Sequence, residues 1–192
     1  SSFSITSLSS MCHPTLLHSY YLFAGASNGS IRVWLLLQQA SSPPPQNNSK
    51  MMLIELSSSS SAACLHSCPV VAIHTDAATG MFCTVGLEDR TVHVFAICHD
   101  QSEIEMKIRT ESGKECEAEA KEQQKKNKSA TYRHVWRFAS HRTSVSSVQF
   151  ASLTGHLLVS CSHGAIIVWS LTTGIQERSM RKETLYELLR GE

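Results

Sequence analysis

Short apolar runs separated by polar breaks dominate residues 141–174. Three such runs follow one another, at residues 144–150, 157–160 and 165–169. The first alternates apolar and polar positions, and the other two are short continuous runs bounded by Ser, Thr, Gly or His. Alternation with a period of two, and apolar runs of this length, predict β-strands rather than helices. We therefore expect three strands, the last of which ends near Trp169.

The same layout recurs twice earlier in the chain. Residues 22–34 (LFAGASNGSIRVW) and 83–95 (CTVGLEDRTVHVF) each hold a strand, a polar turn, a second strand and a terminal aromatic residue. A further apolar run precedes each copy, at residues 5–8 and 70–74. The matched positions are Gly25 with Gly86, Asn28 with Asp89, Ser30 with Thr91 and Ile31 with Val92. The pattern predicts an all-β fold built from three copies of one unit.

These copies resemble blades of the WD-repeat (WD40) β-propeller family. Such blades usually carry Gly-His before the first strand, a turn Asp before the third strand, and Trp-Asp at its end. The corresponding structural blade positions here are His141 for the first element, Asp89 (with Asn28) for the second, and Trp34, Phe95 and Trp169 for the third. The resemblance implies a buried chain of His, Ser, Asp and Trp hydrogen bonds that satisfies polar groups inside a blade.

The match to the family pattern is incomplete in every copy. The residues after the three aromatic anchors are Leu35, Ala96 and Ser170 rather than Asp. The turn that contains His163-Gly164 is expected to be one residue short. We therefore expect degenerate blades, whose stability depends more on apolar packing between sheets than on buried polar networks.

Two polar insertions lengthen the repeat. The aromatic anchors lie 61 and 74 residues apart in this sequence, against ~40–45 residues for an ordinary propeller blade. Residues 38–49 contain three consecutive prolines, and residues 99–130 are rich in Glu and Lys without any aromatic residue. Segments of this kind cannot bury a core, so we expect both to be disordered. The expected blades are about 1–56, 65–138 and 141–180, with fourth strands at 50–56, 132–138 and from 175 onward, and a helical tail in 181–192.

Composition excludes several classes of protein. The chain is 42% hydrophobic and 17% charged with a net charge of +1, as in a globular protein without general attraction to nucleic acid. No apolar run approaches the ~20 residues of a membrane-spanning helix. Residues 1–10 have no basic start and no long apolar core, unlike a signal peptide. The seven cysteines follow no regular spacing, which favours thiols of a reducing compartment.

Motifs for chemistry are sparse. Residues 25–29 match G-x-S-x-G, with Ser27 at the place of a hydrolase nucleophile. That nucleophile elbow needs a helix after the turn, whereas a strand pattern follows here and Asn28-Gly29 favours a hairpin. Cys64 and Cys68 have the spacing of a metal pair, but no second pair follows. We expect no enzyme, no cofactor and no metal, with a serine hydrolase that uses Ser27 as a remote alternative.

The order of features also resembles a narrower group, the pre-rRNA-processing subunits called Ipi-three in yeast and WD-repeat protein eighteen in animals. Residues 68–86 (CPVVAIHTDAATGMFCTVG) are similar to a strand pattern of that family's propeller, in its C-terminal half. A charged insertion follows, and then a blade that begins with Ser140-His141. The resemblance implies a scaffold in the nucleus or nucleolus that binds other proteins of a multisubunit complex, including pre-ribosomal particles, without a membrane or direct nucleic-acid contact.

Alternatives stay open at this stage. The chain is also compatible with a WD-repeat adaptor of another pathway, in the cytoplasm. Lys125, Lys126 and Lys128 could contact RNA phosphates or belong to a nuclear address, or else lie in a solvated loop whose charges nearly cancel. Three blades cannot close a ring, because propellers have ~4–8. We therefore expect a fragment of a longer protein or a unit that another chain completes.

Overall fold

Twelve strands make three four-stranded antiparallel sheets in the computed structural model. The structure describes residues 4–13, 19–39, 50–56, 65–88, 90–98, 132–139 and 141–181. In every sheet, strands that follow one another in the sequence are hydrogen-bonded neighbours, as expected for a repeated all-β unit. The repeat seen in the sequence is therefore a repeat of whole sheets.

Each sheet contains the strands that the apolar pattern predicted. The first consists of β1 (Ile5–Cys12), β2 (Tyr20–Ala26), β3 (Ile31–Gln39) and β4 (Lys50–Glu55). The second consists of β5 (Val70–Asp76), β6 (Met81–Gly86), β7 (Val92–Ile97) and β8 (Tyr132–Phe138). The third consists of β9 (Val145–Ala151), β10 (His156–Cys161), β11 (Ala165–Ser170) and β12 (Gln176–Arg181), with a short 3-10 turn η1 (Ser152–Thr154) after β9.

Several expectations fall on parts of the chain that the structure does not describe. Strand β3 runs to Gln39 and so takes up the first two residues of the expected insertion at 38–49. Residues 40–49 and 99–131 lie outside the described residues. Strand β12 ends at Arg181, and the expected helical tail beyond it, residues 182–192, also lies outside them.

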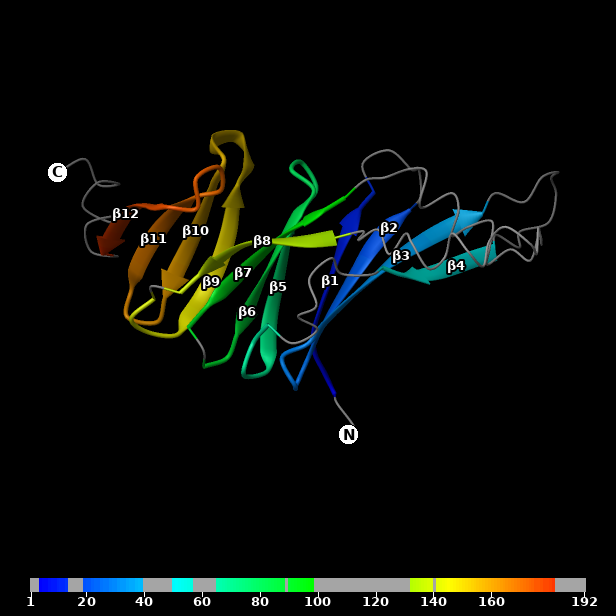
Figure 1. Cartoon of the computed structure of the whole chain (residues 1–192), viewed down its shortest axis with the longest axis horizontal. Coiled ribbons are helices and arrows are strands. Elements are labelled where there is room, and N and C mark those ends of the chain that lie inside the picture. The colour runs from blue at the N-terminus through cyan, green and yellow to red at the C-terminus, as the bar shows by residue number, and fades with distance from the viewer. Residues whose placement is uncertain are drawn as a thin grey trace, which may run out of the picture.

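The three sheets stand side by side, with β1–β4 at one end of the molecule, β9–β12 at the other and β5–β8 between them (Figure 1). We call the face of each sheet that carries Trp34, Phe95 or Trp169 its leading face, and the opposite face its trailing face. The trailing face of the first sheet packs on the leading face of the second. The trailing face of the second packs on the leading face of the third.

Buried aromatic side chains fill both junctions between sheets. At the first, Phe82 and Phe95 stack with their ring centroids 4.7 Å apart and an interplanar angle of 9°. At the second, Phe138 and Trp169 stack at 4.4 Å and 16°. A fully buried side chain of this size contributes about 1.5–3 kcal/mol. Face-to-face packing is therefore what holds the three sheets together.

The turn that contains His163-Gly164 is one residue shorter than the corresponding turn of the second sheet, but it is no shorter than that of the first. In the first sheet the last paired residues around the turn are Gly25 and Ile31, and in the third they are Ser160 and Ile166, which leaves loops of equal length. Both loops close with a backbone hydrogen bond from the turn glycine, of 3.0 Å from Gly29 and 2.9 Å from Gly164.

The second sheet contains the turn that differs. Its last pair is Val85 with Val92, which makes this turn one residue longer than the other two. Arg90 adopts a φ of 54°, close to the left-handed conformation of Gly29 (79°) and Gly164 (78°). A non-glycine residue rarely adopts this conformation without support. Arg90 has such support, because its Nη1 donates to the carbonyl oxygen of Arg142 at 2.9 Å.

Candidate functional site

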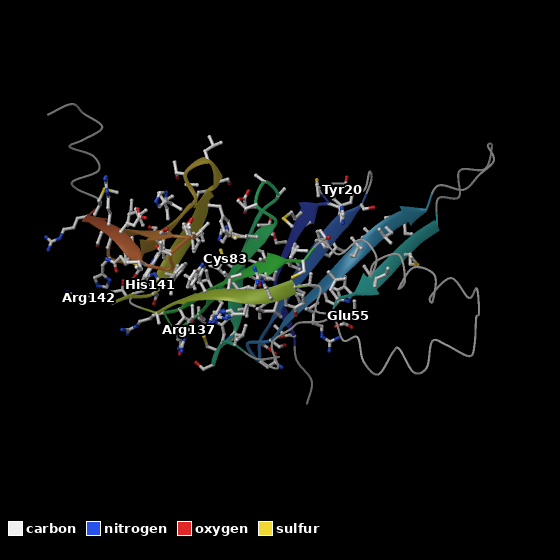
Figure 2. The ribbon with its side chains drawn as sticks, turned by 45° about the horizontal axis from the view of Figure 1, so that its top comes forward. Tyr20, Glu55, Cys83, Arg137, His141 and Arg142 are labelled. Atoms are coloured by element: carbon white, nitrogen blue, oxygen red, sulfur yellow. The ribbon has the colours of Figure 1, made fainter. Side chains whose placement is uncertain are left out.

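The predicted blade residues His141 and Trp169 lie together in the third sheet. Trp169 Nε1 donates a hydrogen bond to His141 Nε2 at 3.4 Å, and His141 Nδ1 lies 2.9 Å from the carbonyl oxygen of Arg90. Because a carbonyl only accepts and an indole only donates, His141 must carry its proton on Nδ1. Burial lowers the pKa of His141, while the bond to Arg90 raises it by a smaller amount. The imidazole is therefore a neutral, structural group. Figure 2 shows where His141 lies.

The other predicted blade residues have different surroundings. Phe95 is buried at the junction of the first and second sheets, where Tyr132 also contacts its ring. Trp34 lies on the leading face of the first sheet, which no other described sheet covers. Asp89 lies outside the described residues. The structure thus brings two of the five positions, His141 and Trp169, into direct contact.

His66 is a structural histidine that the sequence analysis did not assign. Its Nε2 lies 2.9 Å from Thr84 Oγ1, and its Nδ1 lies 3.4 Å from Thr91 Oγ1. The side chain is almost fully buried. His66 precedes β5 by four positions, as His141 precedes β9. That equal offset was the available signal, although no Gly precedes His66 in the sequence.

A second histidine pair extends this buried polar group. His93 and His66 rings make an edge contact at 4.6 Å, and His93 Nδ1 lies 3.0 Å from His134 Nε2. One of those two nitrogens must donate and the other accept, so His93 and His134 cannot both be protonated in this geometry. Burial lowers the pKa of His134, and the charge of Arg137 lowers it further, against one backbone hydrogen bond that raises it.

The described part of the chain contains no assembled site for metal binding or for nucleophilic catalysis. No group of three or more His, Cys, Asp or Glu residues there is placed to hold a metal ion. Cys64 lies outside the described residues, and Cys68 Sγ accepts a hydrogen bond from the Glu88 amide at 3.3 Å. Ser27 lies in the hairpin between two strands, β2 and β3, so the nucleophile-elbow interpretation is wrong.

Three turns on one edge of the molecule are tied together, and we call them the braced edge: residues 77–80, 152–155 and 171–175. Asp76 links the first two, because its Oδ2 accepts hydrogen bonds from Thr79 Oγ1 at 2.6 Å and Ser152 Oγ at 2.8 Å. These turns form the upper edge of the second and third sheets in Figure 1. The contact crosses from one sheet to the next.

The third turn of the braced edge is fixed through Leu171. Its amide donates to the carbonyl oxygen of Gly155 at 2.9 Å, and its own carbonyl accepts from Trp136 Nε1 at 2.8 Å. Two apolar side chains project from this frame, Leu153 at 104% exposure and Ile175 at 64%. The braced edge therefore presents apolar groups on a backbone held by bonds within and between sheets.

A second surface feature lies on the leading face of the first sheet. It is an open hollow of about 500 Å³. The hollow is lined by Leu8, Ser9, Ser10, Leu22, Trp34 and Leu53, which come from all four strands of that sheet. Leu8 is 72% exposed, so this face keeps apolar surface in contact with water. Among the described residues, no helix is long and apolar enough to cross a bilayer.

Comparisons with known proteins give structural matches only, since no protein-family model and no curated protein sequence matches the chain. The β-propeller domain of Myceliophteria thermophila Cps50 (Swd1) is similar with a TM-score of 0.52 at 10% identity, over 93% of this chain and 44% of that one. The RRP9 WD40 repeats match with a TM-score of 0.49 at 18% identity, over 93% and 39%. The computationally designed Ika8 protein matches at 0.48 and 16%, over 92% and 36%.

This chain therefore spans less than half the length of the solved proteins that it matches. At such identities the likeness concerns the fold alone. Together with the three consecutive four-stranded sheets, the similarity to the Cps50 propeller shows that the chain has the fold of a partial β-propeller.

Proposed function

We propose that this chain is a non-catalytic scaffold that binds other proteins through the braced edge. The observation that carries the proposal is the exposure of Leu153 and Ile175 on turns that are fixed by Asp76, Ser152 and Trp136. A rigid frame lowers the entropy lost on binding, and apolar anchors often dominate the affinity of protein interfaces. Loops held on a repeated β frame are also where such proteins place their contacts.

We further propose that its partners belong to the machinery that processes pre-rRNA and assembles the large ribosomal subunit, in the nucleolus. The support is the order of features along the chain. A strand pair of the kind in residues 68–86 comes first, a charged insertion follows, and a blade that begins with Ser140-His141 comes last. The partners would then be other proteins of a multisubunit complex, including pre-ribosomal particles.

The test is affinity purification of the tagged chain from its native cells, with partners identified by mass spectrometry. Leu153→Asp should reduce partner recovery at least about tenfold, because about 1.4 kcal/mol of lost binding energy gives that factor. The matched control is Leu87→Asp, which changes another exposed leucine, in the β6–β7 turn at the opposite edge. It should leave recovery unchanged.

The outcomes separate the two levels of this proposal. Large-subunit assembly factors that are lost with Leu153→Asp but kept with Leu87→Asp would support both levels. A different complex with the same dependence on Leu153 would keep the scaffold and reject the pathway, in favour of an adaptor elsewhere in the cell. Equal recovery with both variants would reject the braced edge as the contact surface.

A further inference from the structure

Exposed arginines lie on the edge of the second sheet opposite the braced edge. We call this surface the arginine edge: Arg90, Arg137 and Arg142. Arg90 lies in the turn before β7, Arg137 lies near the end of β8, and Arg142 follows in the loop that leads to β9. In the ladder that joins them, β7 begins where β8 ends, so the three segments meet at this edge. Figure 2 shows Arg137 and Arg142 in the same part of the molecule, around His141.

Arg90 occupies a backbone position that favours glycine. Its φ is 54°, whereas the matching turns of the first and third sheets have Gly29 at 79° and Gly164 at 78°. Arginine is strained in this conformation and glycine is not. Strained positions of this kind cluster at functional sites, where the surrounding structure maintains them. The strain therefore indicates that the side chain of Arg90 has a role that glycine could not fill.

Two hydrogen bonds fix the backbone of the arginine edge. His141 Nδ1 donates to the carbonyl oxygen of Arg90 at 2.9 Å, and Arg90 Nη1 donates to the carbonyl oxygen of Arg142 at 2.9 Å. These bonds leave the side chain of Arg142 exposed, and they use one of the five N–H donors of the Arg90 guanidinium. The arginines are therefore held in place before a ligand binds, which lowers the entropy lost on binding.

The positive charge of the arginine edge is not neutralised within the described part of the chain. No carboxylate there lies within ion-pair distance of Arg90, Arg137 or Arg142. The charge of Arg137 also lowers the pKa of His134, as expected for a cation without a neighbouring carboxylate. Like charges that are held close together repel one another, so a bound anion would relieve that repulsion.

The first residues of the β6–β7 turn lie outside the arginine edge, although they share the turn with Arg90. The Leu87 amide donates to the carbonyl oxygen of Pro69 at 3.0 Å. The Glu88 amide donates to Cys68 Sγ at 3.3 Å. Both bonds are made with the segment that leads into β5, which lies at the opposite side of the sheet from β8. The turn therefore has a β5 side with Leu87 and a β8 side with Arg90.

The chemistry of the arginine edge favours the carboxylates of a protein segment over nucleic acid. Guanidinium groups bind carboxylates through paired, parallel hydrogen bonds. Single-stranded nucleic acid is held largely by bases that stack on aromatic rings. No Phe, Tyr or Trp among the described residues of this edge is exposed. The net charge of the chain is only +1, so long-range attraction to a polyanion is weak.

We propose that the arginine edge binds a segment of a partner protein that is rich in Asp and Glu. Carboxylates of that segment bridge Arg90, Arg137 and Arg142, which come from a turn, a strand and a loop. The braced edge lies on the opposite edge of the second sheet, so two partners can bind at once. This inference does not rest on the braced edge, and either surface could fail its test without affecting the other.

The test measures the binding of a fluorescent poly-glutamate peptide to the purified chain by fluorescence anisotropy. Arg137→Glu and Arg142→Glu should each raise the dissociation constant at least about tenfold, the factor that corresponds to about 1.4 kcal/mol. Arg133→Glu is the matched control, because Arg133 is an exposed arginine at the other end of β8. It makes the same change in net charge and should change the dissociation constant by less than about twofold. Far-ultraviolet circular dichroism confirms that each variant is folded.

Arg90→Gly tests the strained position itself. Glycine adopts the conformation of this turn without strain, so the variant should remain folded. It should nevertheless raise the dissociation constant about threefold, because one exposed charge pair with the peptide is lost. An unchanged dissociation constant would overturn the role of Arg90, whose side chain would then serve the turn alone.

Other results would overturn the proposal as a whole. One is a wild type that binds poly-glutamate no better than poly-glutamine of the same length. Another is an equal loss of binding in Arg133→Glu and Arg142→Glu, which would mean attraction by net charge alone. A last one is tighter binding of poly-uridine than of poly-glutamate with the same dependence on Arg142, which would identify a nucleic-acid backbone as the ligand.

Discussion

Individual histidines stabilise two of the three sheets by satisfying buried polar groups, although their partners differ. His66 bonds the hydroxyl groups of Thr84 and Thr91, whereas His141 accepts from Trp169 and bonds the carbonyl of Arg90. Buried polar atoms are nearly always hydrogen-bonded, because leaving one unsatisfied is costly. The histidine four residues before the first strand of a sheet therefore bonds different partners in the second and third sheets.

Replacement of His66 by alanine should destabilise the chain by about 1–3 kcal/mol, because the buried hydroxyl of Thr84 loses its partner. His163→Ala, at an exposed turn, should change the free energy of unfolding by less than about 0.5 kcal/mol. Urea denaturation measures both. In a Thr84→Val background the cost of His66→Ala should shrink, since the lost bond no longer exists. Equal costs in both backgrounds would contradict a bond between the two side chains.

At the scale of strands and turns, the sequence predicted the features that depend on the local pattern of apolar and polar residues. Most of the strands follow from apolar runs and alternation, because side chains on a strand face alternate sides with a period of two. Strand β12 (QERSMR) has no such pattern and was expected from its place as the fourth strand of a repeated unit. The longer β6–β7 turn was not predicted, since it depends on which residue pairs with Phe95 across the ladder. The braced edge depends on contacts such as Asp76 with Ser152, 76 positions apart, which no local pattern reveals.

Two turn glycines allow the cost of backbone strain to be distinguished from the cost of a steric overlap. Gly29 (φ 79°) and Gly155 (φ 68°) both adopt the left-handed conformation. A Cβ at Gly29 would overlap the carbonyl oxygen of His66, whereas at Gly155 the nearest atom, Thr172 Oγ1, lies 3.8 Å away. Gly155→Ala should therefore cost only the conformational strain of about 1–2 kcal/mol.

Gly29→Ala should cost roughly 1–3 kcal/mol more than Gly155→Ala, because the overlap with fixed backbone adds to the same strain. The difference in urea midpoint between the two variants measures this excess directly. Equal midpoints would mean that the turn of the first sheet does not press against the segment that leads into the second. That result would mean that the first and second sheets are not in tight contact at this edge.

At the scale of the whole molecule, the stability of the three sheets should depend on pH through histidines that are held neutral in buried or partly buried positions. Burial lowers the pKa of His74, His134 and His141 below 6.5, the usual value for histidine. The unfolded chain therefore takes up protons below about pH 6.5 that the folded chain does not, so the free energy of unfolding falls on acidification. These groups lie in or beside the second sheet, which contacts both neighbours.

We accordingly expect the urea midpoint to decrease between about pH 7.5 and about pH 5.5, with the loss beginning near the ordinary histidine pKa. His134→Gln should flatten this dependence, because the variant removes one group that is neutral when folded and protonated when unfolded. His163→Gln, at an exposed turn, is the matched control and should keep the wild-type slope. A midpoint that rises on acidification over this interval would mean that the folded state binds the protons, and the buried histidines would then have their pKa raised rather than lowered.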